Sequence, residues 1–120
     1  KNQTYRMTML FDFYGDILTD RQRELFDLYY NEDLSLAEIA ENCGISRQGV
    51  RDVIVRAEAA MNELEDKTGL LKRFMRMQDS VDAIVTAANE IKTINYRQYE
   101  NHRLEELADS IIAGAGVLKE

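Results

Sequence analysis

The stretch from Leu36 to Val55 constrains the fold most, because its small and apolar residues are spaced as in two short helices joined by a tight turn. Ala40 falls where the helices approach closely and only a small side chain fits, and Gly44 falls at the turn, where glycine most easily adopts a positive φ. Apolar residues that would lock the two helices together are Ile39, Cys43, Ile45, Val50 and Val53. The stretch predicts a helix-turn-helix, a motif whose DNA-binding form places its second helix in the major groove.

Capping residues mark the starts of three helices. Thr19 with Gln22, and Ser35 with Glu38, match the capping box, in which a hydroxyl and a side chain three residues later satisfy each other's backbone amides. Ser46 is expected to cap the second helix of the motif. With no Pro and few Gly in the chain, these signals predict an all-α fold.

Apolar residues at steps of three and four predict how far the helices extend. They predict a first helix over residues 5–18 and a fourth helix from Arg47 to about Asp66. The inward face of the fourth helix consists of Val50, Val53, Ile54, Ala57, Met61 and Leu64. The opposite, solvent-facing side, which is the candidate reading surface, consists of Gln48, Arg51, Asp52, Val55, Arg56 and Ala59.

Beyond Gly69 the spacing changes to that of helices packed side by side. Apolar residues now step alternately by four and three, which is the heptad pattern. They are Leu70, Phe74, Met77, Val81, Ile84, Ala88 and Ile91. A weaker helix follows a break over residues 93–98, so we expect an antiparallel hairpin whose seams are filled within the chain or by a second copy. A homodimer is favoured, because a hairpin alone leaves residues such as Tyr96 and Val117 without partners.

The charges differ between the two expected parts of the chain, a helix-turn-helix domain over residues 1–68 and a C-terminal helical extension over residues 69–120. The net charge of the chain is −7 at pH 7, which disfavours simple adhesion to nucleic acid or anionic lipid. Residues 19–66 carry most of the acid, whereas residues 67–76 are basic without any acid. Acidic residues that could instead bind a basic protein are Asp20, Glu24, Asp27, Glu32, Asp33, Glu38 and Glu41.

Polar residues at the start of the fourth helix are the first candidate contacts to nucleic acid. Arg47 and Arg51 can each pair with guanine, and Gln48 with adenine, through two hydrogen bonds. The N-terminus of a helix also favours phosphate. Arg56 lies further along the helix, where it can reach a phosphate. The alternative is that these arginines pair with the many acids nearby.

Lys72, Arg73 and Arg76 form a second basic cluster just after the motif. They lie near one another on one helix, so they can grip the phosphate backbone of DNA or of an RNA helix read by its shape. The alternative is a solvated face that offsets the acidic domain, either within the chain or across a dimer.

Other classes of site find no support in the sequence. Cys43 is the only cysteine and His102 the only histidine, and neither has a second ligand at metal spacing, so we expect no internal disulfide, metal, cofactor or catalytic nucleophile. No phosphate-binding glycine loop is present. No apolar run approaches the roughly 18 residues of a membrane span, and no signal-peptide pattern occurs. The sequence therefore predicts a cytoplasmic, non-enzymatic protein.

Three segments resemble the YlxM family of small bacterial helix-turn-helix proteins. They are RMTMLFDFYGDILTDRQ (residues 6–22), LYYNEDLSLAEIAE (residues 28–41) and GISRQGV (residues 44–50). Residues 18–66 also resemble region 4 of bacterial sigma factors. The YlxM resemblance implies no enzymatic activity. It implies a role in the signal recognition particle pathway, because YlxM-like proteins are usually encoded beside the GTPase of that particle.

Two hypotheses follow for the function. The first is a regulator of the signal recognition particle pathway that contacts DNA or RNA through the fourth helix. The second is a protein–protein adaptor that keeps the helix-turn-helix as a scaffold and binds a basic partner through its acidic face. The fold alone does not decide between them, because one scaffold can carry either site.

Overall fold

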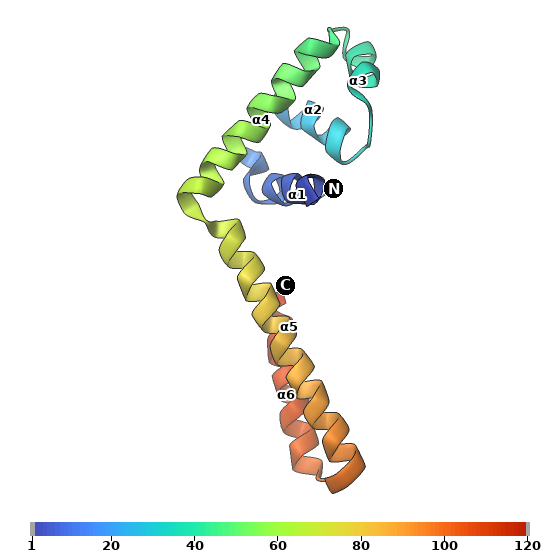
Figure 1. The fold of residues 1–120 in the computed structure, drawn as a ribbon, viewed down its shortest axis with the longest axis vertical. Helices are drawn as coiled ribbons and strands as arrows, with labels where there is room; N and C mark the ends of the chain where they lie inside the picture. Colours follow the sequence, from blue (N-terminus) through green and yellow to red (C-terminus); the bar gives the residue numbers. More distant parts are fainter. Residues whose placement is uncertain (1, 120) are drawn as a thin grey trace. The chain divides into compact units, whose positions relative to one another are not determined.

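The computed structural model describes residues 2–119, without the side chains of residues 2 and 3. All regular structure in this range is helical, which confirms the all-α fold (Figure 1). The elements are α1 (Asn2–Tyr14), the 3₁₀ turn η1 (Gly15–Ile17), α2 (Asp20–Tyr30), α3 (Leu36–Cys43), α4 (Arg47–Thr68), α5 (Leu70–Ile94), the π turn η2 (Asn95–Tyr99) and α6 (His102–Lys119). The chain forms two compact units, Lys1–Leu71 and Lys72–Glu120, so the units divide three residues beyond the expected boundary.

The predicted caps are present in the first unit. The Thr19 hydroxyl accepts from the Gln22 amide at 3.1 Å, and the Gln22 side chain accepts in return from the Thr19 amide at 3.0 Å. Ser35 and Glu38 form the same reciprocal pair at 3.1 and 2.9 Å. Each pair satisfies amides that a helix start leaves unbonded, so α2 and α3 begin at the expected residues.

The first helix ends earlier than predicted. α1 stops at Tyr14, and a single 3₁₀ turn, closed by a 3.1 Å bond from the Leu18 amide to the Gly15 carbonyl, replaces the expected last turn. The tighter turn changes the direction of the side chains, so Leu18 stays buried while Ile17 is 53% exposed. Prediction of a helix through residue 18 was therefore wrong, since apolar spacing does not distinguish a final α turn from a 3₁₀ turn.

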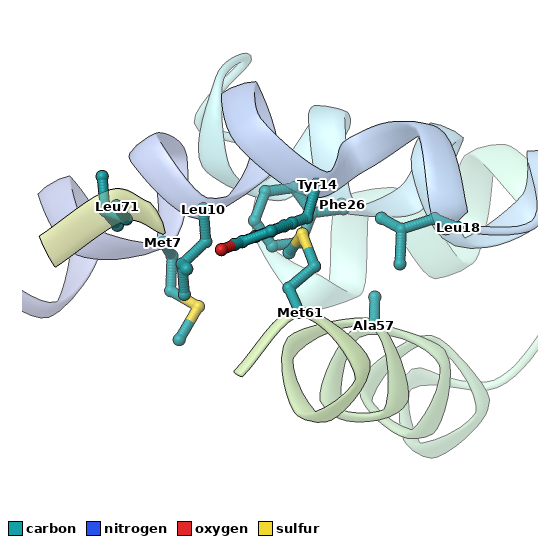
Figure 2. Packing of buried hydrophobic residues seen from close by; sticks show 8 residues of the cluster. All are labelled: Met7, Leu10, Tyr14, Leu18, Phe26, Ala57, Met61 and Leu71. Carbon is teal, nitrogen blue, oxygen red and sulfur yellow. The ribbon is translucent and has the colours of Figure 1, made fainter. Parts of the chain in front are cut away.

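Two apolar clusters hold the first unit together, and α4 contributes to both. The first joins α1, α2 and α4, and Figure 2 shows its side chains converging between the helices. Its members are Met7, Leu10, Tyr14, Leu18, Phe26, Ala57, Met61 and Leu71. The second joins α2, α3 and the start of α4 through Leu25, Ile39, Ala40, Val50 and Ile54. Because α4 spans both clusters, the helix that carries the candidate reading surface is fixed along most of its length.

A buried carboxylate ties the end of α4 to α1 and to the start of α5. Glu65 is only 7% exposed, and its Oε1 accepts from the Tyr14 hydroxyl at 2.7 Å and from the Leu71 amide at 3.0 Å. The Tyr14 and Thr68 hydroxyls are also hydrogen-bonded, at 2.6 Å. Buried charge is tolerated where it is hydrogen-bonded in this way. No local pattern in the sequence marks Glu65 for this role.

We expect the first unit to lose stability at alkaline pH. Burial raises the pKa of Tyr14, and burial followed by the hydrogen bond to Glu58 raises the pKa of Tyr30. Both phenols therefore bind their protons more tightly in the folded chain than in the unfolded chain. Their contribution to stability is fully present below the unfolded pKa of about 10 and is lost as pH rises above it.

Urea unfolding between neutral and alkaline pH measures this effect. The free energy of unfolding should fall above about pH 10, and Tyr14→Phe and Tyr30→Phe should each make the fall shallower, because phenylalanine has no proton to release. Identical pH profiles for the wild type and both variants would contradict the assignment.

The second unit is an antiparallel hairpin of α5 and α6 (Figure 1). Ion pairs Lys92–Asp109 and Lys119–Asp82, both at 2.6 Å, connect the two helices. The expected break over residues 93–98 overlaps the π turn. There the Asn95 side chain donates to the Asn101 carbonyl and accepts from the Asn101 amide, both at 2.8 Å.

The hairpin buries only part of the expected heptad seam of α5. Val81 and Ala88 are buried, but Met77, Ile84 and Ile91 are 44–46% exposed. The predicted line runs between two adjacent faces of the helix, and α6 covers only one of them. Periodicity identifies apolar positions, but the position of the neighbouring helix decides which of them are buried.

Candidate nucleic-acid interface

The turn of the helix-turn-helix is fixed by its backbone. Gly44 has φ 70°, the left-handed conformation that ends α3, and the amides of Gly44 and Ile45 both donate to the Ala40 carbonyl, at 2.9 and 3.2 Å. Ala40 is buried in the cluster that holds α3 against α4. The predicted roles of Ala40 and Gly44 are thus confirmed, and this turn sets where α4 begins.

Ser46 caps α4 as predicted. Its hydroxyl accepts from the Gly49 amide at 2.9 Å. A Cβ at position 49 would lie 3.2 Å from that hydroxyl, so glycine keeps the cap undistorted. The cap uses one amide of the first turn, and the remaining positive end of the helix dipole favours an anion nearby.

Three arginines on α4 are exposed to solvent: Arg47, Arg51 and Arg56. With the residues that the structure describes, none of them makes a hydrogen bond or an ion pair. The alternative reading, in which these arginines pair with nearby acids, therefore finds no support. Exposed guanidinium groups with all donors unused are suited to contact phosphate or guanine.

Gln48 differs from these arginines because its side chain is already engaged. Its Nε2 donates to the Asp52 carboxylate, one turn further along α4, at 2.9 Å. Pairing with adenine would require this bond to break. Gln and Asp spaced i, i+4 are a known hydrogen-bonding pair on helices, so the spacing of Gln48 and Asp52 is a sequence signal for this bond.

The second basic cluster belongs to the other compact unit. Lys72, Arg73 and Arg76 are exposed near the start of α5. Cations in the first turn of a helix oppose its dipole, and the first turn of α5 has no acid to offset them. The dipole of α5 thus does not favour Lys72 and Arg73, which lie in its first turn, whereas Arg76 lies in its second turn. Lys67, by contrast, pairs with Glu63 at 3.3 Å.

Comparison with known proteins agrees with the motif geometry. Residues 1–109 match the family described as "Putative helix-turn-helix protein, YlxM / p13 like" (UPF0122). The chain belongs to this family. A UPF0122 protein of Thermoanaerobacter sp. (strain X514) is 51% identical over 78 residues, covering 65% of this chain and 67% of that protein. A UPF0122 protein of Acetivibrio thermocellus is 36% identical over 116 residues, covering 91% of this chain and 99% of that protein. The YlxM resemblance is thereby confirmed.

Two surface hollows of this YlxM-like chain differ in charge. The smaller, of about 90 Å³, lies beside Arg51 and is lined by Tyr29, Tyr30, Leu36, Arg51, Ile54, Val55 and Glu58. The larger, of about 300 Å³, includes Asp33 and Glu38, whose carboxylates repel phosphate. Nucleic acid is therefore expected on the side of Arg51. Val55, one turn after Arg51, adds an exposed apolar contact there that the sequence analysis placed on the reading surface without a role.

Residues 2–119 show no arrangement of side chains typical of a metal site or a catalytic site. No three histidine, cysteine or acidic side chains in this range are grouped as metal ligands. Cys43 is half-buried beside the second cluster, and His102 lies 3.3 Å from Glu106 on the surface of α6. No helix in the described range has both the length and the apolar composition to cross a bilayer. A helix-turn-helix family points instead to a non-enzymatic role.

Proposed function

We propose that this YlxM-like protein is a non-enzymatic regulator that binds nucleic acid through the exposed start of α4. The observation that carries the proposal is the set of exposed arginines without partners, Arg47, Arg51 and Arg56, on the second helix of a helix-turn-helix. Arg47 and Arg51 lie one turn apart and contact base edges or phosphates together. Arg56 contacts the phosphate backbone.

The remaining charges orient the complex. Lys72, Arg73 and Arg76 supply a second set of phosphate contacts from the start of α5. The acidic residues of α2 and α3 repel the backbone, so the nucleic acid approaches only the arginine side of α4. This combination allows a chain with a net charge of −7 to bind a polyanion.

The proposed cellular role follows from the family resemblance. The YlxM resemblance supports a function in the signal recognition particle pathway, in the cytoplasm, with a component of that particle as partner. The likeness of residues 18–66 to sigma region 4 supports use of the helix-turn-helix as a reading element. Separately, the apolar spacing of residues 70–91 supports a homodimer.

Salt dependence of binding tests the proposal. Labelled duplex DNA, the RNA of the signal recognition particle and an unrelated structured RNA are titrated with the full chain, and fluorescence anisotropy measures the affinity. Each phosphate contact contributes a slope of about −0.9 to log K against log salt, so three arginine contacts predict about a 40-fold loss of affinity between about 50 and 200 mM salt. Binding to none of these probes at low salt, or affinity independent of salt, would overturn the proposal.

A further inference from the structure

The helices of the hairpin each carry two apolar lines, of which one faces the other helix. This inner line is made of small residues, all at most 5% exposed: Val81, Ala88, Ala108 and Ala115. The outer line is made of large residues that are 38–53% exposed: Met77, Ile84 and Ile91 on α5, and Leu104, Leu107, Ile111 and Leu118 on α6. The hairpin therefore buries its small apolar residues and leaves large ones in contact with solvent.

The two outer lines lie on the same side of the hairpin. On α5, Ile84 lies three residues after Val81, which places it roughly 60° to one side of the inner line of Val81 and Ala88 around the helix axis. On α6, Ile111 lies three residues after Ala108 and is offset from the inner line of Ala108 and Ala115 by the same angle. Because α5 and α6 are antiparallel and their inner lines face each other, equal offsets direct both outer lines to one face, which we call the outer face.

The outer face has the pattern of one half of a four-helix bundle. A two-helix hairpin uses one seam per helix, whereas each helix of a four-helix bundle packs against two neighbours and needs two. Met77, Ile84 and Ile91 are spaced by seven residues, and so are Leu104, Ile111 and Leu118. An exposed apolar surface with this regular spacing is typical of a helix–helix interface.

Charges beside the outer face complement each other in a second copy of the chain. Arg76 immediately precedes Met77, and Glu90 immediately precedes Ile91. Met77 and Ile91 belong to the outer line and are each seven residues from Ile84. A two-fold axis at Ile84 that pairs α5 antiparallel with itself places Met77 opposite Ile91 of the second copy. It then brings Arg76 near Glu90 of the second copy, and the same contact forms twice by symmetry.

Arg76 and Glu90 are both available for an ion pair with a second copy. Arg76 and Glu90 are exposed, and within the described residues neither makes an ion pair. We infer that the outer face of α5 and α6 binds a second copy of this chain as a symmetric four-helix bundle, with Ile84 at the two-fold axis. This inference rests on the homodimer proposed above and names its surface and register. It assigns Arg76 to the dimer interface and leaves Lys72 and Arg73 as the phosphate contacts near the start of α5.

Sedimentation equilibrium of the full chain without nucleic acid tests the outer face. Lys119 pairs with Asp82, so Leu118 of α6 lies level with Ile84 of α5. Ile84→Asp and Leu118→Asp should each raise the dissociation constant of the dimer about 100-fold or more, because each change occurs twice near the two-fold axis. Since both side chains are exposed in the single chain, circular dichroism should show helical monomers. Thr86→Asp is the matched control: it lies on exposed α5 surface directed away from both lines and should leave the dimer unchanged.

Charge exchange tests the register. Arg76→Glu and Glu90→Arg should each weaken the dimer about 3- to 10-fold, and the double variant should return it to near the wild-type value. A wild-type chain that stays monomeric up to about 100 μM would overturn both the dimer and its surface. If the wild type is a dimer and both aspartate variants dimerise as tightly as it does, the chain is a dimer but the outer face is not its interface. Single exchanges that the double exchange does not rescue would overturn the register at Ile84.

Discussion

Replacing Arg47 and Arg51 together by alanine is expected to lower the affinity for nucleic acid about 100-fold or more, which is the largest functional effect that we expect from surface residues. Both guanidinium groups lie at the start of α4, one turn apart, with no partner among the described residues. Each loses its hydrogen bonds to a base edge or phosphate when it is truncated, and such a contact contributes about 1–3 kcal/mol.

The fold should be unaffected by this double change. Like charges one turn apart on a helix repel each other weakly, so removing them costs the helix nothing, and neither side chain contributes to the apolar clusters. The control is Arg21→Ala with Arg23→Ala, which removes two exposed arginines from α2 that form ion pairs with Glu24 and Asp16. Anisotropy titrations and thermal unfolding compare the two double variants. If the Arg47 and Arg51 variant binds as tightly as the control, α4 is not the contact surface.

The features that sequence predicted well are those determined by residues close in the chain. The hydroxyls of Thr19, Ser35 and Ser46 bond amides three residues away, and the positive φ of Gly44 depends on that residue alone. Exposure of the arginines on α4 followed from helix periodicity, because the inward side was marked by apolar residues.

The features that sequence missed depend on residues far apart in the chain. Glu65 is buried because Tyr14, 51 residues away, donates to it, and no local pattern signals that contact. The heptad spacing through Ile84 left open whether α6 or a second copy covers that line, since spacing alone gives two adjacent apolar faces and does not say which one α6 covers. The absence of ion pairs at Arg47 and Arg51 likewise depends on where the acids of α2 and α3 lie after folding.

Phe26→Ala is expected to have the largest effect on stability, lowering the free energy of unfolding of the first unit by about 3–5 kcal/mol. The Phe26 ring is 0% exposed, stacks on Phe11 with centroids 4.7 Å apart and lies 4.5 Å from the Tyr30 ring. Its removal leaves a cavity bounded by α1, α2 and α4, where the helices are too firmly packed to close the gap.

Ile17→Ala is the control for this change, because it removes an apolar side chain that is 53% exposed and should alter stability by only about 0.5 kcal/mol. Urea unfolding followed by circular dichroism measures both variants, and a Phe26→Ala effect no larger than that of the control would show that this cluster does not support the unit. The outcome also bears on binding. Since α4 is held by the same cluster, the Phe26 variant should lose affinity only as the first unit unfolds, whereas the Arg47 and Arg51 variant should lose it while fully folded. The two variants together thus separate the scaffold from the surface that it positions.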